Sequence, residues 1–244
     1  MPIDRAYLFG VGVDCVDMAT MEHAADQAVR EDRQCAILAV NPEKIVTAEH
    51  DAELRTALNA SEYLIPDGIG VVHALRRRGH RLAGRVPGSE LMPRLCALAA
   101  QRGYRIFLFG AREDVNRAAA SRLIATYPGL VVAGRQHGYS DEAESSALVE
   151  RINASAADML FVALGSPRQE RWIAQHRGAL CARVIQGVGG TFDVLAGAAR
   201  RAPPVWIRLN LEWLYRALAN PRRLPRQAAL FKFAFRVLLE RPAS

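Results

Sequence analysis

The residue best suited to acid–base chemistry is Asp67, in the sequence Pro66-Asp67-Gly68. It stands where a predicted strand passes into a predicted helix, so its carboxylate should project into a ligand crevice while Gly68 keeps the backbone close to the ligand. A carboxylate in such a place can act as a general base. The alternative is that Asp67 only caps the following helix, a role that aspartate favours.

Two further segments carry groups suited to an anion. Arg85 lies between two glycines in GRVPGSE (84–90) and could reach an anionic group above the strand ends, although a surface salt bridge is the competing explanation. Gln169 and Glu170 follow Gly165-Ser166-Pro167 and fall in the first turn of a predicted helix, whose amino end is favourable for phosphate. Glu170 would alternatively be an ordinary first-turn acid that stabilises the helix.

Glycine-rich turns supply further candidates for ligand binding. The segment GVGGTFD (187–193) contains Gly189 and Gly190, whose backbone amides could approach a diphosphate or a nucleoside. It is not a Walker loop, because no Gly-Lys-Ser/Thr sequence follows. Gly110 ends another predicted strand. Near the amino terminus, FGVGVDCV has a G-x-G, but Cys15 occupies the third glycine position of the dinucleotide fingerprint, which disfavours an NAD enzyme.

The histidines and cysteines do not form a recognisable metal motif. The six histidines lack the spacing of metal ligands, and no Asp-x-Asp pair is present to hold a divalent ion on a nucleotide diphosphate. The sequence therefore predicts neither a metal nor a cofactor. The four cysteines are far apart and are not preceded by a secretory leader, so we expect reduced thiols in a cytoplasmic protein.

The elements that must position these residues repeat along the chain. Short apolar runs end in Gly, Pro or Asn and pass into segments with helical spacing, which is typical of βαβ units. The five predicted strands are 35–40, 62–65, 104–109, 158–164 and 182–186. This rhythm predicts an α/β fold with a Rossmann-like parallel sheet flanked by helices, in which ligands bind beyond the carboxyl ends of the strands.

Positive charge is concentrated at the carboxyl terminus. Residues 200–244 hold ten basic and two acidic residues, a net charge of +8, whereas the rest of the chain holds 22 basic and 23 acidic residues. Aromatic residues alternate with these charges, as in helices that lie at the surface of an anionic membrane. We therefore expect an α/β catalytic domain over 1–199 and a basic, amphipathic, membrane-associating appendage over 200–244. An ordinary terminal helix packed on the core is the alternative, and a nucleic-acid surface ranks below both because no nucleic-acid-binding motif accompanies the charge.

Seven motifs together resemble one family, the WecG/TagA/CpsF glycosyltransferases, also called glycosyltransferase family 26. The likeness runs from about residue 8 to about residue 235. The motifs are DGIGVV (67–72), GRVPGSE (84–90), LFGARED (108–114), GSPRQERWI (165–173), GVGGTFDVLAG (187–197), RRAP (200–203) and LEWLYR (211–216).

The resemblance implies an inverting, metal-independent hexosyltransferase of bacterial surface or exopolysaccharide biosynthesis. Such an enzyme takes a hexose or N-acetylhexosamine-type sugar from a UDP-sugar and adds it to an undecaprenyl-diphosphate-linked monosaccharide. It would be cytoplasmic and peripherally attached to the inner face of the plasma membrane, with an anionic membrane surface, and no nucleic acid, as a partner.

The resemblance also implies roles for individual residues. The family's base falls on Asp67, its active-site asparagine on Asn41 and its arginine on Arg85, while its glutamine falls on Gln169 and a nucleotide-side aspartate on Asp193. Residues 110, 165, 189 and 190 lie in the substrate-binding turns. The arginines expected over the site are Arg216, Arg222, Arg223 and Arg226. Some members have a threonine two positions before the asparagine, where this chain has Ala39. The hydrogen bond of that hydroxyl is absent here, so the preference for the sugar donor is expected to differ.

Two other functions remain as alternatives. The first is a non-catalytic nucleotide-sugar-binding component of a polysaccharide assembly complex, and the second is a Rossmann-like oxidoreductase. The sequence leaves open the transferred sugar, the donor nucleotide, the first sugar of the acceptor, the polymer, and the oligomeric state, including a homo-oligomer.

Overall fold

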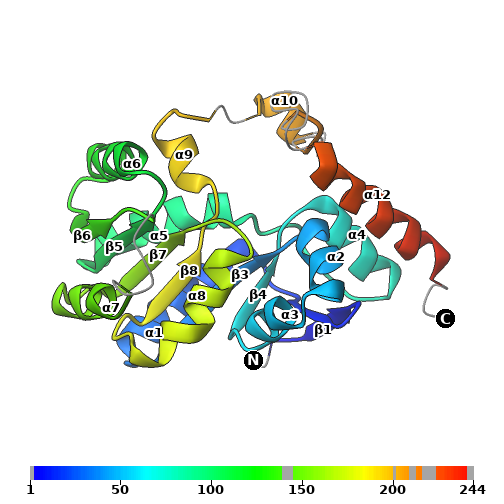
Figure 1. The fold of residues 1–244 in the computed structure, drawn as a ribbon, viewed down its shortest axis with the longest axis horizontal. Coiled ribbons are helices and arrows are strands. Elements are labelled where there is room, and N and C mark those ends of the chain that lie inside the picture. The colour runs from blue at the N-terminus through cyan, green and yellow to red at the C-terminus, as the bar shows by residue number, and fades with distance from the viewer. Residues whose placement is uncertain (1–2, 139–144, 200–201, 209–212, 216–223, 241–244) are drawn as a thin grey trace.

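A six-stranded parallel sheet forms the centre of the molecule, with strand order β4-β3-β8-β7-β5-β6 (Figure 1). The computed structural model describes residues 3–138, 145–199, 202–208, 213–215 and 224–240. The strands are β3 (Cys35–Val40), β4 (Tyr63–Pro66), β5 (Arg105–Gly110), β6 (Val131–Gln136), β7 (Met159–Ala163) and β8 (Val184–Gly187). The predicted fold class is confirmed, and all five predicted strands are present. Strand β6 was not predicted from the sequence.

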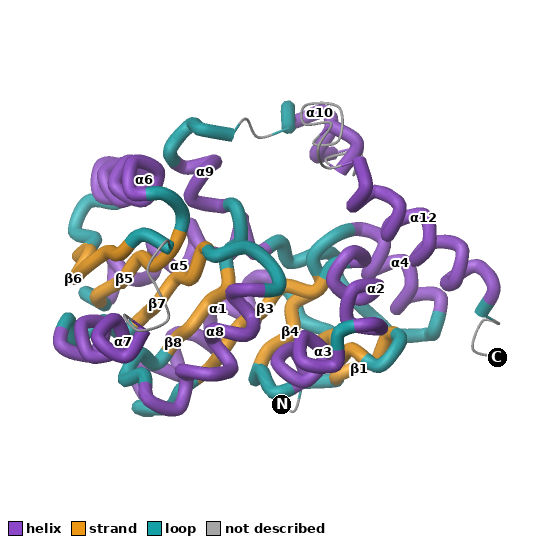
Figure 2. The backbone as a smooth tube through the Cα atoms, in the orientation of Figure 1, coloured by secondary structure: helices purple, strands orange, loops and turns teal. Residues whose placement is uncertain are grey.

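Helices cover both faces of the sheet (Figure 2). One face packs against α1 (Met18–Arg30), α5 (Gly88–Arg102), α6 (Glu113–Thr126) and α9 (Thr191–Leu195). The other packs against α2 (Pro42–His50), α3 (Ala52–Asn59), α4 (Ile69–Arg77), α7 (Ser145–Ala154) and α8 (Arg168–His176). Strand β3 shows how the sequence builds both layers, because Leu38 contributes to one core and Ile37 to the other. Successive side chains of a strand point to opposite faces, so a strand covered on both sides is apolar throughout.

The amino-terminal G-x-G belongs to a β-hairpin. Strands β1 (Arg5–Leu8) and β2 (Val11–Asp14) pair antiparallel, with Leu8 opposite Val11. The two residues between them, Phe9 and Gly10, have φ angles of 51° and 83°, as a tight two-residue turn requires. Phosphate-binding glycines lie instead in a turn between a strand and a helix. The hairpin therefore explains these glycines without a dinucleotide.

The carboxyl-terminal helix α12 (Leu224–Leu239) packs against α2 and α4. Its Phe233 is 2% exposed and joins the core, with its ring 5.8 Å from that of Phe9 in an edge-on arrangement. The guanidinium of Arg236 lies 4.0 Å from the centre of the Phe9 ring and also pairs with Glu49. The short helix α10 (Pro204–Arg208) lies between α9 and α12 in Figure 1. Among the described residues, no helix combines the length and the apolarity needed to cross a membrane.

Gly110 is required by the close approach of two strand ends. The amide of Ala111 donates to the carbonyl of Ala163 at 2.9 Å, and Gly110 has a φ of 118°. A Cβ atom at Gly110 would lie 2.4 Å from that carbonyl oxygen. Packing of the β5 and β7 ends therefore accounts for this glycine, whether or not a ligand also approaches it.

Gly110→Ala should lower the free energy of unfolding by about 3 kcal/mol, because it adds both a backbone clash and backbone strain. Gly103→Ala is the matched control: Gly103 has a φ of 75° but open space around it. The control should cost only about 1–2 kcal/mol. Urea denaturation of both variants measures the difference, and equal losses would contradict the steric explanation.

Candidate functional site

Main-chain hydrogen bonds hold Asp67 and Arg85 at the same edge of the sheet. The amide of Asp67 donates to the carbonyl of Val40 at 2.8 Å, and the amide of Val86 donates to the carbonyl of Pro66 at 2.7 Å. Asp67 and Arg85 are therefore neighbours along the ends of β3 and β4, and both are partly buried.

Asp67 does not occupy the N-cap position of the following helix, α4. The N-cap of α4 is Gly68, which has a φ of 102°. That backbone conformation suits glycine, and a Cβ atom there would lie 3.5 Å from Cδ of Pro42. Asp67 directly precedes this cap position.

Arg85 forms an ion pair with Glu90. Its Nη2 lies 3.4 Å from Oε1 of Glu90, longer than the roughly 2.8 Å of a strong charge-assisted hydrogen bond. The Arg85 side chain is 19% exposed. The predicted competing ion-pair partner of Arg85 therefore exists.

Asn41 caps α2. Its Oδ1 accepts a hydrogen bond from the amide of Lys44 at 2.9 Å, and Pro42 occupies the first helical position. Asn41 directly follows β3 and is partly buried. Capping accounts for its oxygen, and this bond fixes the side chain beside the end of β3.

Gln169 is 2% exposed and holds two turns together. Its Oε1 accepts from the amide of Gly189 at 2.9 Å, and its Nε2 donates to Oε1 of Glu170 at 2.8 Å. The packing is close, since a Cβ atom at Gly187 would lie 2.9 Å from the Gln169 Nε2. Both ends of the Gln169 amide therefore bind the protein itself, and its clearest role is to shape the turn after β8.

Lys44 and Glu170 form a buried ion pair that sequence reasoning missed. Lys44 Nζ lies 2.7 Å from Glu170 Oε1 and donates to the carbonyl of Ala39 at 2.6 Å. The Glu170 side chain is fully buried, so it is not an ordinary exposed first-turn acid. Burial alone would raise the pKa of Glu170, but the Lys44 charge and the hydrogen bonds from Lys44 and Gln169 outweigh it and lower that pKa. The sequence offered one weak signal, in that Lys44 is one of only two lysines.

The remaining predicted residues differ in how far the structure places them. Asp193 is partly buried in the first turn of α9, and a Cβ atom at Gly190 would lie 3.7 Å from its Oδ2. Gly165 has a φ of 74°, and a side chain there would meet open space. Three of the predicted arginines, Arg216, Arg222 and Arg223, lie outside the described residues. Arg226 belongs to α12, but its side chain is not among those described.

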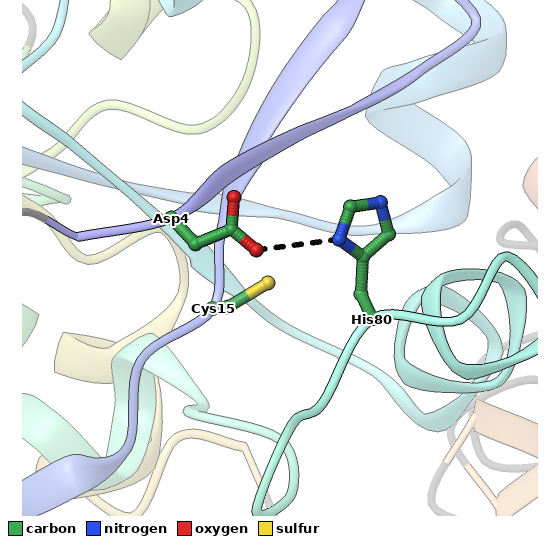
Figure 3. A group of neighbouring side chains, drawn as sticks. All are labelled: Asp4, Cys15 and His80. Carbon is green, nitrogen blue, oxygen red and sulfur yellow. Dashed lines mark hydrogen bonds and ion pairs between the residues drawn. The ribbon is translucent and has the colours of Figure 1, made fainter.

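A second cluster of reactive side chains lies apart from these turns (Figure 3). The ligand atoms of Asp4, Cys15 and His80 all lie within 4.8 Å of one another, with His80 Nδ1 3.3 Å from Asp4 Oδ2. Sequence spacing could not indicate this group, because its members come from three separate segments. Burial, followed by the charge of Asp4, raises the pKa of the Cys15 thiol to about 11, so Cys15 is not an activated nucleophile.

The open parallel sheet and the polar turns at its carboxyl edge define a Rossmann-like α/β protein with a ligand site at that edge. The chain belongs to the WecG/TagA/CpsF glycosyltransferase family, whose model matches residues 6–244, and it is therefore a glycosyltransferase. It is 38% identical over 219 residues to the N-acetylglucosaminyldiphosphoundecaprenol N-acetyl-beta-D-mannosaminyltransferase of Bacillus subtilis (strain 168). That match covers 90% of this chain and 83% of the relative.

The Lys44–Glu170 pair predicts a pH dependence of stability. The pKa of Glu170 is lowered from its ordinary value of 4.5, so the stabilisation is present above about pH 4.5 and is lost as pH falls through the lower, folded-state pKa. Wild type should therefore lose stability relative to Lys44→Met/Glu170→Gln between about pH 5 and pH 3. Urea denaturation across this range measures the difference. A difference that does not change with pH would contradict the lowered pKa.

Proposed function

We propose that this glycosyltransferase moves a hexose or N-acetylhexosamine-type sugar from a UDP-sugar to an undecaprenyl-diphosphate-linked monosaccharide, with inversion at the transferred carbon. The observation that carries the proposal is that main-chain bonds to Val40 and Pro66 hold the backbone of Asp67 and of Val86, the residue after Arg85, at the carboxyl edge of the sheet. The name of the Bacillus subtilis relative supports an acceptor of this chemical class.

Asp67 serves as the base in this mechanism. It takes the proton from the acceptor hydroxyl as that oxygen attacks the anomeric carbon, while the bond from that carbon to the donor diphosphate breaks on the opposite face. The leaving diphosphate gains negative charge, which Arg85 and the amino ends of nearby helices stabilise.

The remaining predicted site residues bind the donor in this proposal. Asn41 is the active-site asparagine, Asp193 contacts the nucleotide, and Gln169 acts through the turn that contains Gly189 and Gly190. Gly165 and Gly110 keep the neighbouring turns close to the ligand. The appendage completes the site with Arg216, Arg222, Arg223 and Arg226.

Asp67→Asn separates this enzyme from a non-catalytic nucleotide-sugar-binding component. Loss of the base should reduce turnover by about 10²–10⁴-fold, while UDP affinity stays within about threefold. Product mass from UDP-sugars and a lipid-diphosphate monosaccharide measures turnover, and calorimetry measures UDP binding. The control is Asp32→Asn, an exposed aspartate at the opposite edge of the sheet, paired with Arg183, with a φ of 54° that asparagine tolerates. Unchanged turnover in Asp67→Asn would remove Asp67 from the mechanism.

We also propose that α12 holds the enzyme peripherally on an anionic membrane. One face of α12 is anchored in the core through Phe233, whereas four large apolar side chains of the helix are 63–68% exposed. These are Phe231, Phe235, Leu238 and Leu239. Lys232 and Arg236 lie on the same helix and share one ion-pair partner, Glu49, so the three residues together carry a net positive charge. Apolar side chains beside basic ones suit insertion among anionic headgroups.

Phe231→Ser/Phe235→Ser should weaken binding to vesicles of phosphatidylglycerol and phosphatidylethanolamine by at least about tenfold, since each buried phenylalanine contributes roughly 1.5–3 kcal/mol. Cosedimentation measures the bound fraction. Tyr7→Ser removes an aromatic residue that is 58% exposed but lies on β1, and it should leave binding unchanged. Equal binding by wild type and the double variant would show that α12 does not insert.

A further inference from the structure

We infer that Lys44 and Glu170 are positioning residues, which fix the amide of Gln169 and, through it, the backbone of the turn at Gly189 in the shape that binds the donor nucleotide. This inference rests on the proposed function, because it assigns the nucleotide to that turn. Lys44 was not among the predicted site residues, and the sequence did not indicate that Glu170 pairs with it.

The pair joins three turns at the carboxyl edge of the sheet. Lys44 Nζ contacts the Ala39 carbonyl, near the end of β3, and Oε1 of Glu170, in the first turn of α8. The same Glu170 oxygen accepts from Gln169 Nε2, and Gln169 Oε1 accepts from the amide of Gly189, after β8. A continuous chain of short polar contacts of 2.6–2.9 Å therefore runs from the end of β3 to the turn after β8.

The charge on Glu170 fixes the orientation of the Gln169 side-chain amide. A carboxylate can only accept hydrogen bonds, so the NH₂ group of Gln169 must face Glu170 and its oxygen must face Gly189. A neutral amide at position 170 could both donate and accept, so it would allow the Gln169 amide to rotate and lose its bond to Gly189. Lys44 keeps the carboxylate ionised in a fully buried place.

Lys44 also connects the pair to Asn41. Its backbone amide donates to Asn41 Oδ1 while its side chain reaches Glu170, so one residue links the asparagine after β3 to the turns after β7 and β8. A buried ion pair seldom stabilises a fold more than apolar residues of the same shape do. Its geometry is thus better explained by the placement of Asn41, Gln169 and Gly189 than by stability.

The test separates positioning from stability with a neutral pair. Glu170→Gln alone leaves Lys44 buried beside a neutral group, whereas Lys44→Met/Glu170→Gln removes both charges and should recover most of the lost thermal stability. The double variant should still show a donor KM at least about fivefold higher than wild type and hydrogen exchange at the Gly189 amide at least about tenfold faster, because Gln169 is no longer held in one orientation. The acceptor KM should change by less than about twofold.

Glu22→Gln/Arg94→Met is the matched control, since Arg94 Nη1 and Glu22 Oε1 form an exposed pair at 2.7 Å between α5 and α1. It should leave the donor KM and the Gly189 exchange unchanged. If the double variant regains stability together with wild-type donor KM and wild-type Gly189 exchange, the pair is only structural and the inference is wrong. If the double variant does not fold, the donor KM and the hydrogen exchange at Gly189 are measured on Glu170→Gln instead.

Failure of the proposed function would look different. Wild-type protein would then neither bind UDP nor transfer a sugar, although Gly189 exchange would still report whether the pair holds the turn. Wild-type exchange at Gly189 in both Glu170→Gln and the double variant would overturn the inference whatever the outcome for UDP.

Discussion

The parallel alignment of the strands is the constraint on which the rest of the structure depends. Backbone bonding between neighbouring segments continues past the strand ends, from Asp67 to Val40, from Val86 to Pro66 and from Val188 to Val162. Neighbouring strands are about 4.8 Å apart, so each of these bonds places a turn one strand spacing from the next. Residues far apart in the sequence therefore form one edge, and that edge is where the polar side chains gather.

The edge is stiffened by groups that a ligand would not contact first. Lys44, Gln169 and Glu170 are buried, and they take up hydrogen-bonding capacity that the turns would otherwise leave unsatisfied. Removing one member of such a network leaves the other members buried without a partner, which lowers the free energy of unfolding. The effects of mutating its members are therefore not additive. Asp67 and Arg85, which we propose as catalytic groups, are partly buried at the same edge of the sheet.

Helix α12 resolves two interpretations that the sequence presented as alternatives. Phe233 is part of the core, as in an ordinary terminal helix, while Phe231 and Phe235 remain exposed. The helix packs on α2 and α4, and the amino ends of these two helices follow Asn41 and Gly68. The same helix is thus attached to the elements that position the site and carries the exposed face assigned to the membrane.

The sequence by itself determined the fold class, because apolar runs that end in glycine, proline or asparagine and pass into helical spacing specify local structure directly. It also placed Asn41 and Asp67 directly after predicted strands, since position within a strand–turn–helix unit is a local property. It did not reveal β6, whose apolar pattern is weak. Nor did it reveal the hairpin around Gly10, because a G-x-G sequence occurs both in hairpins and in phosphate-binding turns between a strand and a helix. Only the tertiary structure decided that Glu170 is buried against Lys44, that Gly110 is required by Ala163 and that Phe233 enters the core. Each of these depends on which segments meet in space. Contacts between segments far apart in the sequence produce no periodic pattern of residues from which they could be predicted.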